Sequence, residues 1–509
     1  MKTQINQLRT GALLSYVNLA LGCLIPMFYT PVMLELLGQA EYGLYSLSSS
    51  AVSYLTLLTF GFGSTIIRYI SKARAENNNA EVRRLFGFFL GLYLVLDLLV
   101  VIGGLVIAGN VEPVFKKGLA DDELAKVSSL ILIMTINTAL SFPLSVYSSV
   151  IVSYERYLFL RILDILGTIA APISNLAILY SGYGSVGMAY ASCVIQFIIL
   201  LVNILYCTKK LRILPRFERI GSSLIKEMLG FSVFVFLGTL VDMLFWATDK
   251  IILGMLVGSV AVAVYNVGGT FNNIITNLST SISGVLTPKI TGMVIQNASK
   301  KELTDLFIRI GRIQYIIIAL IASGFIVFGM PFIRIWAGPE YGQAYWVALM
   351  TMLPLCIPLI QNTGLSIVIA QNKHRFRSIV YLIIAIVNVI FTYLTVPTMG
   401  IIGAAFCSCL SYIAGQGIIM NLYYYKVTGL DIPLFWKNIG KMSIVPAFLL
   451  LSGLTLVWFI EIDNWFLFFA LVACYTAAYA VLMYLFALND YEKSVILEPV
   501  RKFIKKKAS

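Results

Sequence analysis

Charged residues are scarce in this chain. Only 12% of the 509 residues are charged, 59% are apolar, and the mean hydropathy is +0.88. An ordinary soluble domain is about 25% charged and about 45–50% apolar. The composition therefore excludes a water-soluble globular protein and predicts one that places most of its surface in lipid.

Histidine and cysteine form no catalytic or metal-binding pattern. His374 is the only histidine, so we expect no histidine-based catalysis or proton relay. All seven cysteines lie within apolar runs, which argues against a disulfide framework or a metal cluster. We predict no catalytic residue, no resident metal and no cofactor other than a coupling H⁺ or Na⁺.

Long apolar runs recur along the whole chain. Each is long enough to cross a hydrocarbon layer of about 30 Å as a helix. The sequence therefore predicts an all-α integral membrane protein with fourteen transmembrane helices, near residues 11–35, 44–69, 85–109, 127–153, 162–181, 187–207, 228–256, 261–288, 305–335, 343–370, 379–397, 401–425, 443–461 and 464–487.

The net charge of +13 comes from lysines and arginines concentrated on one side of the predicted membrane. With the N-terminus inside, 32 of the 37 lie in cytoplasmic segments. This positive-inside bias predicts a membrane protein with both termini in the cytoplasm, and it argues against a nucleic-acid partner. The five exceptions are Lys116, Lys117, Lys126, Lys250 and Arg334.

Two short motifs occur twice at almost the same spacing. The stretch LGQAEYGLYSLSSS at residues 37–50 is echoed by VGSVAVAVYNVGGT at residues 257–270, a shift of 220. Likewise GSVGMAYASC at 184–193 is echoed by GIIGAAFCSC at 400–409, a shift of 216. These echoes predict that helices 1–6 and 7–12 are copies of one unit.

Six helices is an even number, so both copies enter the membrane in the same direction, as in transporters whose two halves face a central cleft. Helices 13 and 14 have no counterpart and are two extra C-terminal helices. The predicted organisation is an N-terminal half (1–207), a basic cytoplasmic linker (208–226), a C-terminal half (227–425), a cytoplasmic loop (426–442), helices 13 and 14 (443–487) and a basic cytoplasmic tail (488–509).

Several of these motifs resemble the polysaccharide-exporter, or Wzx-type oligosaccharide flippase, branch of the multidrug/oligosaccharidyl-lipid/polysaccharide exporter superfamily. They are LGQAEYGLYSLSSS, FGFGSTIIRYISK, TDKIILGMLVGSVAVAVY and the GYGSVG/GMAYASC turn. The resemblance implies a flippase of the bacterial cytoplasmic (inner) membrane that carries undecaprenyl-pyrophosphate-linked oligosaccharides to the outer leaflet. It also implies that the last two helices are similar to those that form a lipid groove in lipid II flippases.

Polar residues inside apolar helices are the first candidate site. Such groups are costly in a membrane and usually functional. The predicted eighth helix is the most polar, and its partner in the repeat, the second helix, carries serines at the same level. We predict that these helices line the cleft, although hydrogen bonding between packed helices is the alternative. The candidates are Ser50, Ser53, Trp246, Lys250, Thr270, Asn273, Asn277 and Thr280.

Three carboxylates in the apolar runs are candidates for ion coupling. Asp242 lies near the middle of the seventh predicted helix, with Trp246 and Asp249 on the same stripe. Asp97 lies at the centre of the third. A buried carboxylate needs water or a cation nearby to stay ionised, which suits binding of H⁺ or Na⁺. The alternative is a carboxylate held by hydrogen bonds to a neighbouring helix.

Four cations lie near the inner ends of helices 2, 8 and 9: Arg68, Lys289, Arg309 and Arg312. Arginine offers paired donors that suit a pyrophosphate. We predict that these residues surround a cytoplasmic mouth and bind the substrate headgroup, while anchoring by the positive-inside rule explains them equally well.

The leading hypothesis is thus an alternating-access flippase for lipid-linked oligosaccharides, with membrane lipids and polysaccharide polymerases or glycosyltransferases as expected partners. A cation-coupled multidrug exporter of the same superfamily is the alternative. A membrane glycosyltransferase or polymerase is disfavoured because the outer loops are short and the cytoplasmic loops lack a D-x-D motif. The sequence therefore predicts a transporter and not an enzyme.

Overall fold

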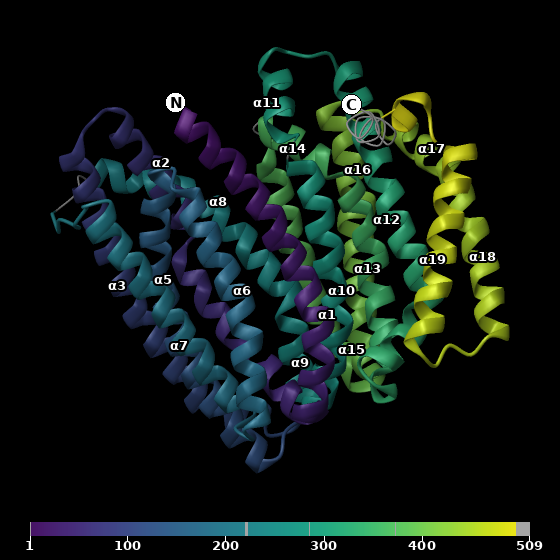
Figure 1. Cartoon of the computed structure of the whole chain (residues 1–509), viewed down its shortest axis with the longest axis horizontal. Helices are drawn as coiled ribbons and strands as arrows, with labels where there is room; N and C mark the ends of the chain where they lie inside the picture. Colours follow the sequence, from purple (N-terminus) through teal and green to yellow (C-terminus); the bar gives the residue numbers. More distant parts are fainter. Residues whose placement is uncertain (1, 219–221, 285, 372, 495–509) are drawn as a thin grey trace, which may run out of the picture. The chain divides into compact units, whose positions relative to one another are not determined.

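The computed structural model describes residues 2–218, 222–284, 286–371 and 373–494, which are almost entirely helical and contain no strand. The chain packs into two compact units (Figure 1). Unit 1 is Met1–Asn266 with Ala385–Ala404, and unit 2 is Val267–Ile384 with Ala405–Ser509. These units are defined by packing, whereas the halves at 1–207 and 227–425 are defined by the sequence repeat and remain a prediction.

Unit 1 is built from long helices with short connections. Its elements are α1 (Lys2–Ser53), η1 (Tyr54–Thr59), α2 (Phe62–Ala75), α3 (Asn79–Gly109), α4 (Val111–Phe115), α5 (Asp121–Ser153), α6 (Tyr157–Tyr180), α7 (Gly184–Leu205), η2 (Tyr206–Lys210), α8 (Ser222–Trp246) and α9 (Thr248–Leu256). The close approach of α3 to α5 requires a small residue, because a Cβ on Gly104 would lie 2.2 Å from the side chain of Thr135.

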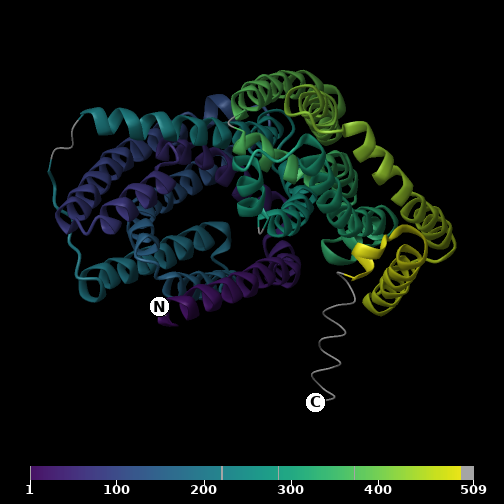
Figure 2. The same ribbon diagram turned by 90° about the horizontal axis from the view of Figure 1, so that it is seen from above.

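Unit 2 contains more helix breaks. After α10 (Ser259–Gly284), which begins in unit 1, it contains α11 (Thr287–Ile295), α12 (Lys300–Trp336), η3 (Pro339–Tyr341), α13 (Gln343–Ile360), α14 (Asn362–Ala370), η4 (Ile413–Ile419), α16 (Met420–Tyr423), η5 (Tyr424–Thr428), α17 (Ile432–Met442), α18 (Ile444–Phe459), α19 (Trp465–Leu482) and η6 (Met483–Ala487). The middle of α15 (His374–Tyr412) packs in unit 1. Helices α18 and α19 lie at the edge of unit 2, where both contact α12 (Figure 2).

Nine helical stretches of the described residues are long and apolar enough to span a membrane, or ten if the bent pair α17 and α18 forms one span. Two of the nine, Val17–Ala75 and Arg375–Thr428, are 59 and 54 residues long. At 1.5 Å per residue each suffices for two crossings of a 30 Å layer. The all-α membrane fold is confirmed, and the elements are consistent with fourteen crossings.

The repeated motifs coincide with backbone turns that require glycine. Gly38 and its echo Gly258 have φ of 74° and 126°, and Gly184 and its echo Gly400 have φ of 59° and 56°. Residues with a Cβ rarely adopt these values, whereas glycine does so without strain. The sequence echo therefore reflects the same backbone requirement at matching places in the chain.

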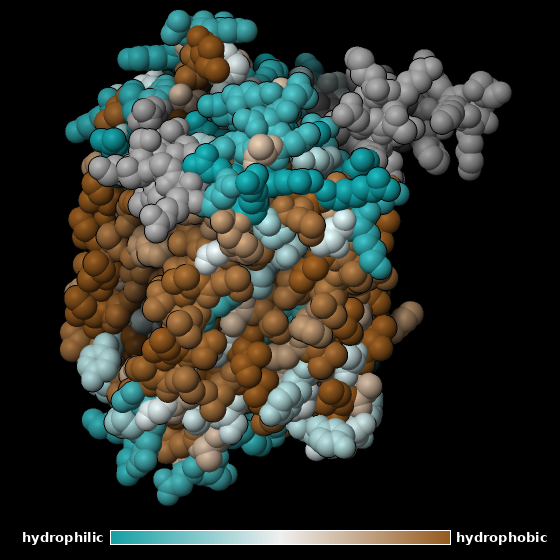
Figure 3. Space-filling model, turned by 90° about the vertical axis from the view of Figure 1, so that its left-hand side faces the viewer, coloured by the Kyte–Doolittle hydropathy of each residue, from teal (hydrophilic) through white to brown (hydrophobic). Residues whose placement is uncertain are grey.

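The outward surface of several helices is apolar. On α3, exposed side chains follow one another along the helix, with Val95, Leu98 and Val106 each about 60% exposed. Figure 3 shows a broad hydrophobic band on one face of the molecule, bordered above and below by hydrophilic residues. A surface of this extent is stable in contact with lipid but not in water.

Candidate functional site

The first repeated turn is held by a carboxylate that contacts two other helices. Glu41 follows the turn at Gly38 and accepts hydrogen bonds from Lys126 Nζ at 3.1 Å and from the backbone N–H of Ser185 at 2.6 Å. Ser185 belongs to the second repeated motif, at the start of α7. The two motifs thus meet in unit 1, and Lys126, an exception to the positive-inside bias, has a structural partner.

Lys250, another exception, also has a partner at this end of unit 1. Its Nζ donates to Asn266 Oδ1 at 3.1 Å, and the Asn266 amide donates to the Tyr42 hydroxyl at 2.6 Å. The neighbouring Asp249 is fully buried and accepts a hydrogen bond from the hydroxyl of Tyr265. These contacts account for Asp249 and Lys250 structurally, while their proposed coupling and cavity-lining roles stay predictions.

The two other carboxylates lie in different surroundings. Asp242 is exposed on α8, four residues before the half-buried Trp246 that ends this helix. Asp97 is half-buried on α3, and its Oδ1 atom is buried without a hydrogen-bond partner among the described residues. A buried carboxylate oxygen without a hydrogen-bond partner in an apolar helix is a candidate for binding a cation or a proton.

The serines predicted to line the cleft from the second helix bond to their own backbone. Ser50 Oγ donates to the carbonyl of Ser46 at 2.8 Å, and Ser53 Oγ donates to that of Ser50 at 2.7 Å. Hydroxyls bonded in this way bend helices. The chain here tightens into the 3₁₀ segment η1 and breaks at Phe60 and Gly61, both of which have positive φ.

The polar side chains of α10 divide into two sets. The predicted stripe of Asn273, Asn277 and Thr280 is exposed, and Thr270 is half-buried. Asn272 and Ser279 are instead buried and bond to other helices of unit 2. The Asn272 amide donates to Thr351 Oγ1 at 2.8 Å, and Ser279 Oγ donates to the carbonyl of Leu359 at 2.9 Å.

Unit 1 also contains a polar cavity that the sequence did not reveal. Its volume is about 530 Å³, and its polar lining comes from α1, α5, α6 and α7: Asn18, Asn137, Asp164, Thr168, Ser192 and Gln196. Thr168 Oγ1 donates to Asn18 Oδ1 at 3.1 Å, and Asp164 pairs with Arg161 at 3.0 Å. The sequence signal was weak, with only one or two of these polar residues in each apolar run, because the residues gather from four helices.

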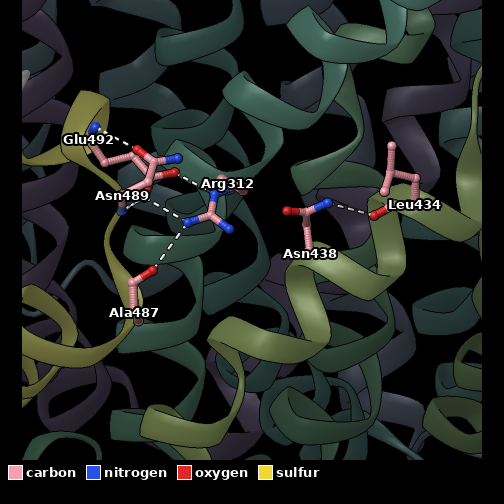
Figure 4. Close-up of polar contacts among 6 residues, drawn as sticks. All are labelled: Arg312, Leu434, Asn438, Ala487, Asn489 and Glu492. Atoms are coloured by element: carbon pink, nitrogen blue, oxygen red, sulfur yellow. Dashed lines mark hydrogen bonds and ion pairs between the residues drawn. The ribbon is translucent and has the colours of Figure 1, made fainter.

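The four predicted headgroup residues differ in their surroundings. Arg68, Lys289 and Arg309 are exposed. Arg312 is buried and forms a bidentate ion pair with Glu492, in which Nε and Nη2 lie 2.5 and 2.8 Å from the carboxylate oxygens (Figure 4). The guanidinium that we expected to contact a headgroup is therefore already occupied.

This ion pair fixes the segment that follows η6. Arg312 Nη2 also donates to the carbonyl of Ala487 at 3.1 Å, while Asn489 and Glu492 cap each other's backbone N–H groups. The Arg309 guanidinium lies 4.7 Å from the ring centre of Tyr491. Two of the four arginine and lysine candidates thus contact the start of the C-terminal segment.

Comparison with known proteins gives a family and a fold. Residues 8–294, more than half of the chain, match the family model described as polysaccharide biosynthesis protein. The chain is 20% identical over 492 residues to the uncharacterized membrane protein EpsK of Bacillus subtilis, covering 95% of this chain and 96% of that protein. It is 23% identical over 364 residues to an uncharacterized membrane protein of Methanocaldococcus jannaschii, covering 69% and 71%.

Solved structures share the fold at low sequence identity. The lipid II flippase MurJ in an inward closed conformation matches with a TM-score of 0.71 and 15% identity, over 96% of this chain and 99% of that one. An inward-facing multidrug resistance MATE family transporter matches with a TM-score of 0.65 and 15% identity, over 83% and 99%. The chain is thus a multi-pass membrane protein with the fold of these transporters, and it belongs to the polysaccharide biosynthesis protein family.

Proposed function

We propose that this protein is an alternating-access flippase that moves undecaprenyl-pyrophosphate-linked oligosaccharides across the bacterial cytoplasmic membrane. The observation that supports this most strongly is the match of the polysaccharide biosynthesis model together with a fold similarity to a lipid II flippase over 96% of the chain. The similarity to a multidrug transporter extends over 83%. A drug exporter is therefore the second candidate, and an enzymatic function has no support.

The exposed amides of α10 are the best candidates for contacts with the sugars. Asn273 and Asn277 are four residues apart on one face of the helix, and both are exposed. An asparagine offers two donors and one acceptor, which suits sugar hydroxyls. By contrast, Asn272 is buried against Thr351 and is expected to stabilise the fold without contacting the substrate.

The headgroup of the substrate carries a pyrophosphate and needs cations. Arg68, Lys289 and Arg309 keep exposed side chains, so we retain them as the candidate headgroup residues. The distribution of basic residues predicts that both termini lie in the cytoplasm, and with that topology these three residues would lie on the side from which the substrate is loaded.

The function is tested with purified protein in vesicles that contain a fluorescent undecaprenyl-pyrophosphate oligosaccharide. Flipping is measured as the fraction of fluorophore that a membrane-impermeant quencher reaches with time. We expect transport by the wild type, and a loss of about tenfold or more for Asn273→Ala with Asn277→Ala, because two sugar contacts of about 1 kcal/mol each are removed. Ser281→Ala is the matched control, since Ser281 bonds to the backbone of its own helix.

The same vesicles separate the two candidate functions. Export of a cationic dye without any flipping of the labelled lipid would contradict the flippase and favour the multidrug exporter. Equal loss of transport in Ser281→Ala would show that the α10 variants act through the fold and not through the substrate.

Ion coupling is tested at Asp242, the exposed carboxylate of α8. Asp242→Asn keeps the shape of the side chain but removes its titration, so substrate binding should persist while transport driven by a proton or Na⁺ gradient is lost. The same change at Asp97 serves as a comparison, because its buried Oδ1 has no partner among the described residues. Full gradient-driven transport by both variants would contradict carboxylate coupling at these two positions.

A further inference from the structure

The helix α17 has the composition of an interfacial helix. It buries Ile432, Phe435, Ile439 and Met442 against unit 2, and it exposes Leu434, Lys437 and Lys441 on the opposite side. Asp431 caps its first turn by accepting from Leu434 N–H at 2.9 Å, and Asn438 donates to the carbonyl of Leu434 at 2.8 Å (Figure 4). Apolar residues on one face and lysines on the other are typical of helices that lie at a membrane surface.

An apolar cavity of about 390 Å³ begins beneath this helix. Its walls come from α12, α13, α17 and α18. Along α12 it extends from Tyr315 to Ile326, which corresponds to about 16 Å at 1.5 Å per residue. The lining residues Leu353 and Ala447 are exposed, so the cavity is open to the surface of unit 2. This surface lies within the apolar part of the bundle, where lipid chains are the surrounding solvent.

The end of the cavity at α17 is well ordered by hydrogen bonds. The indole of Trp436 lines the cavity and donates from Nε1 to Asn421 Oδ1 at 2.9 Å. The hydroxyls of Tyr315 and Ser443, which also line it, lie 2.5 Å apart. These hydrogen bonds hold the Trp436 and Tyr315 side chains in the cavity wall.

Two lysines lie on the exposed face of α17, next to Trp436 along the helix. Lys437 directly follows Trp436, and Lys441 is four residues further on the same exposed face. Between Trp436 and Lys437 on the helix surface lies Gly440, where an added Cβ would meet nothing within 4 Å. The exposed face of α17 next to Trp436 therefore carries two positive charges and an open position at Gly440.

We propose that this site binds an anionic phospholipid, with one acyl chain in the cavity and the phosphate between Lys437 and Lys441. The predicted topology places α17 on the cytoplasmic side, where the leaflet is negatively charged and attracts lysines close to the surface. Two lysines act as point charges and lack the paired donors with which arginine binds a pyrophosphate. The site therefore fits a single phosphate better than the headgroup of the transported lipid.

The experiment uses the full-length protein in detergent. Binding of phosphatidylglycerol and of phosphatidylcholine with identical acyl chains is measured by native mass spectrometry. We expect a preference for phosphatidylglycerol that falls by about fivefold for each lysine replaced in Lys437→Gln and Lys441→Gln. Lys300→Gln with Lys301→Gln removes the same charge from the exposed start of α12 and should leave the preference unchanged.

The apolar part of the site is tested separately. Ala447→Trp places a large ring in the cavity and should abolish binding of both lipids at this site, whereas Ile444→Trp, at a position that is 70% exposed and does not line the cavity, should not. Equal binding of the two lipids by the wild type would overturn the proposal. Displacement of phosphatidylglycerol from this site by equimolar undecaprenyl pyrophosphate would also overturn it and assign the site to the substrate.

Discussion

The predicted second helix (44–69), which begins in the structure as the end of α1 and η1, and α10 are predicted to be equivalent in the repeat, but their polar residues bond differently. In the second helix, Ser50, Ser53, Thr56 and Thr59 each donate to a backbone carbonyl three or four residues earlier. In α10, buried Asn272 and Ser279 bond to distant segments of unit 2. The same polar pattern thus reshapes one helix locally and links the other helix to its neighbours.

If the proposed function is correct, this difference separates the polar residues that stabilise the fold from those that contact the substrate. Ser279 Oγ also accepts from Asn362 Nδ2 at 3.0 Å and from Gln314 Nε2 at 3.3 Å, so a single hydroxyl joins α10, α12 and the break between α13 and α14. A helix fixed at these points can expose Asn273 and Asn277 in a constant direction. In the second helix the local bonds instead favour the break at Phe60 and Gly61.

The largest effect is expected at the buried ion pair between Arg312 and Glu492. Their side chains are only 10% and 1% exposed. Arg312→Gln leaves the carboxylate buried without its charge partner, which typically costs about 3–5 kcal/mol. We expect a correspondingly lower free energy of unfolding in mixed micelles of detergent and SDS.

Two variants distinguish this pair from an ordinary surface charge. Arg309→Gln, three residues earlier and exposed, should change the unfolding free energy by less than about 1 kcal/mol. Arg312→Met combined with Glu492→Leu should recover most of the lost stability, because an apolar pair of similar size has no unpaired charge. Loss of stability in the double variant equal to that in Arg312→Gln would contradict this explanation.

An intermediate effect is expected for the cross-helix bonds of α10. Asn272→Ala removes the bond to Thr351, and such interhelical bonds in membranes contribute about 0.6 kcal/mol on average and up to about 1.7. The unfolding free energy should fall within this range, while flipping by the correctly folded fraction should match the wild type. A transport defect without any loss of stability would instead place Asn272 in the substrate path.

The sequence predicted the membrane fold better than the contacts of single side chains. A membrane span can be recognised from a local run of apolar residues, because it depends only on the length of that run. The repeated glycines at 38, 184, 258 and 400 are likewise explained locally, because each has a positive φ that favours glycine. The partner of Arg312 lies 180 residues away, so a pattern near Arg312 cannot reveal it. The cavity around Asn18 and Thr168 was missed for the same reason, since its polar residues come from four helices.

The smallest effect on stability is expected in the second helix. Ser53→Ala removes a hydroxyl whose bond is to the carbonyl of Ser50, three residues earlier, and a helix carbonyl has a backbone donor available in its place. We expect a change of at most a few tenths of a kcal/mol, because such local bonds compete with the helix and do not join it to a neighbour. Transport should nevertheless slow, because a more regular helix would oppose the break at Phe60 and Gly61. Many transporters have discontinuous helices of this kind near their binding sites.

The measurement pairs SDS unfolding with the flipping assay, and Ser129→Ala, which removes an exposed hydroxyl bonded within α5, is the control for both. A destabilisation by Ser53→Ala as large as that by Asn272→Ala would show that the two repeat mates do not differ, and that the second helix too is held by its polar side chains against the rest of unit 1.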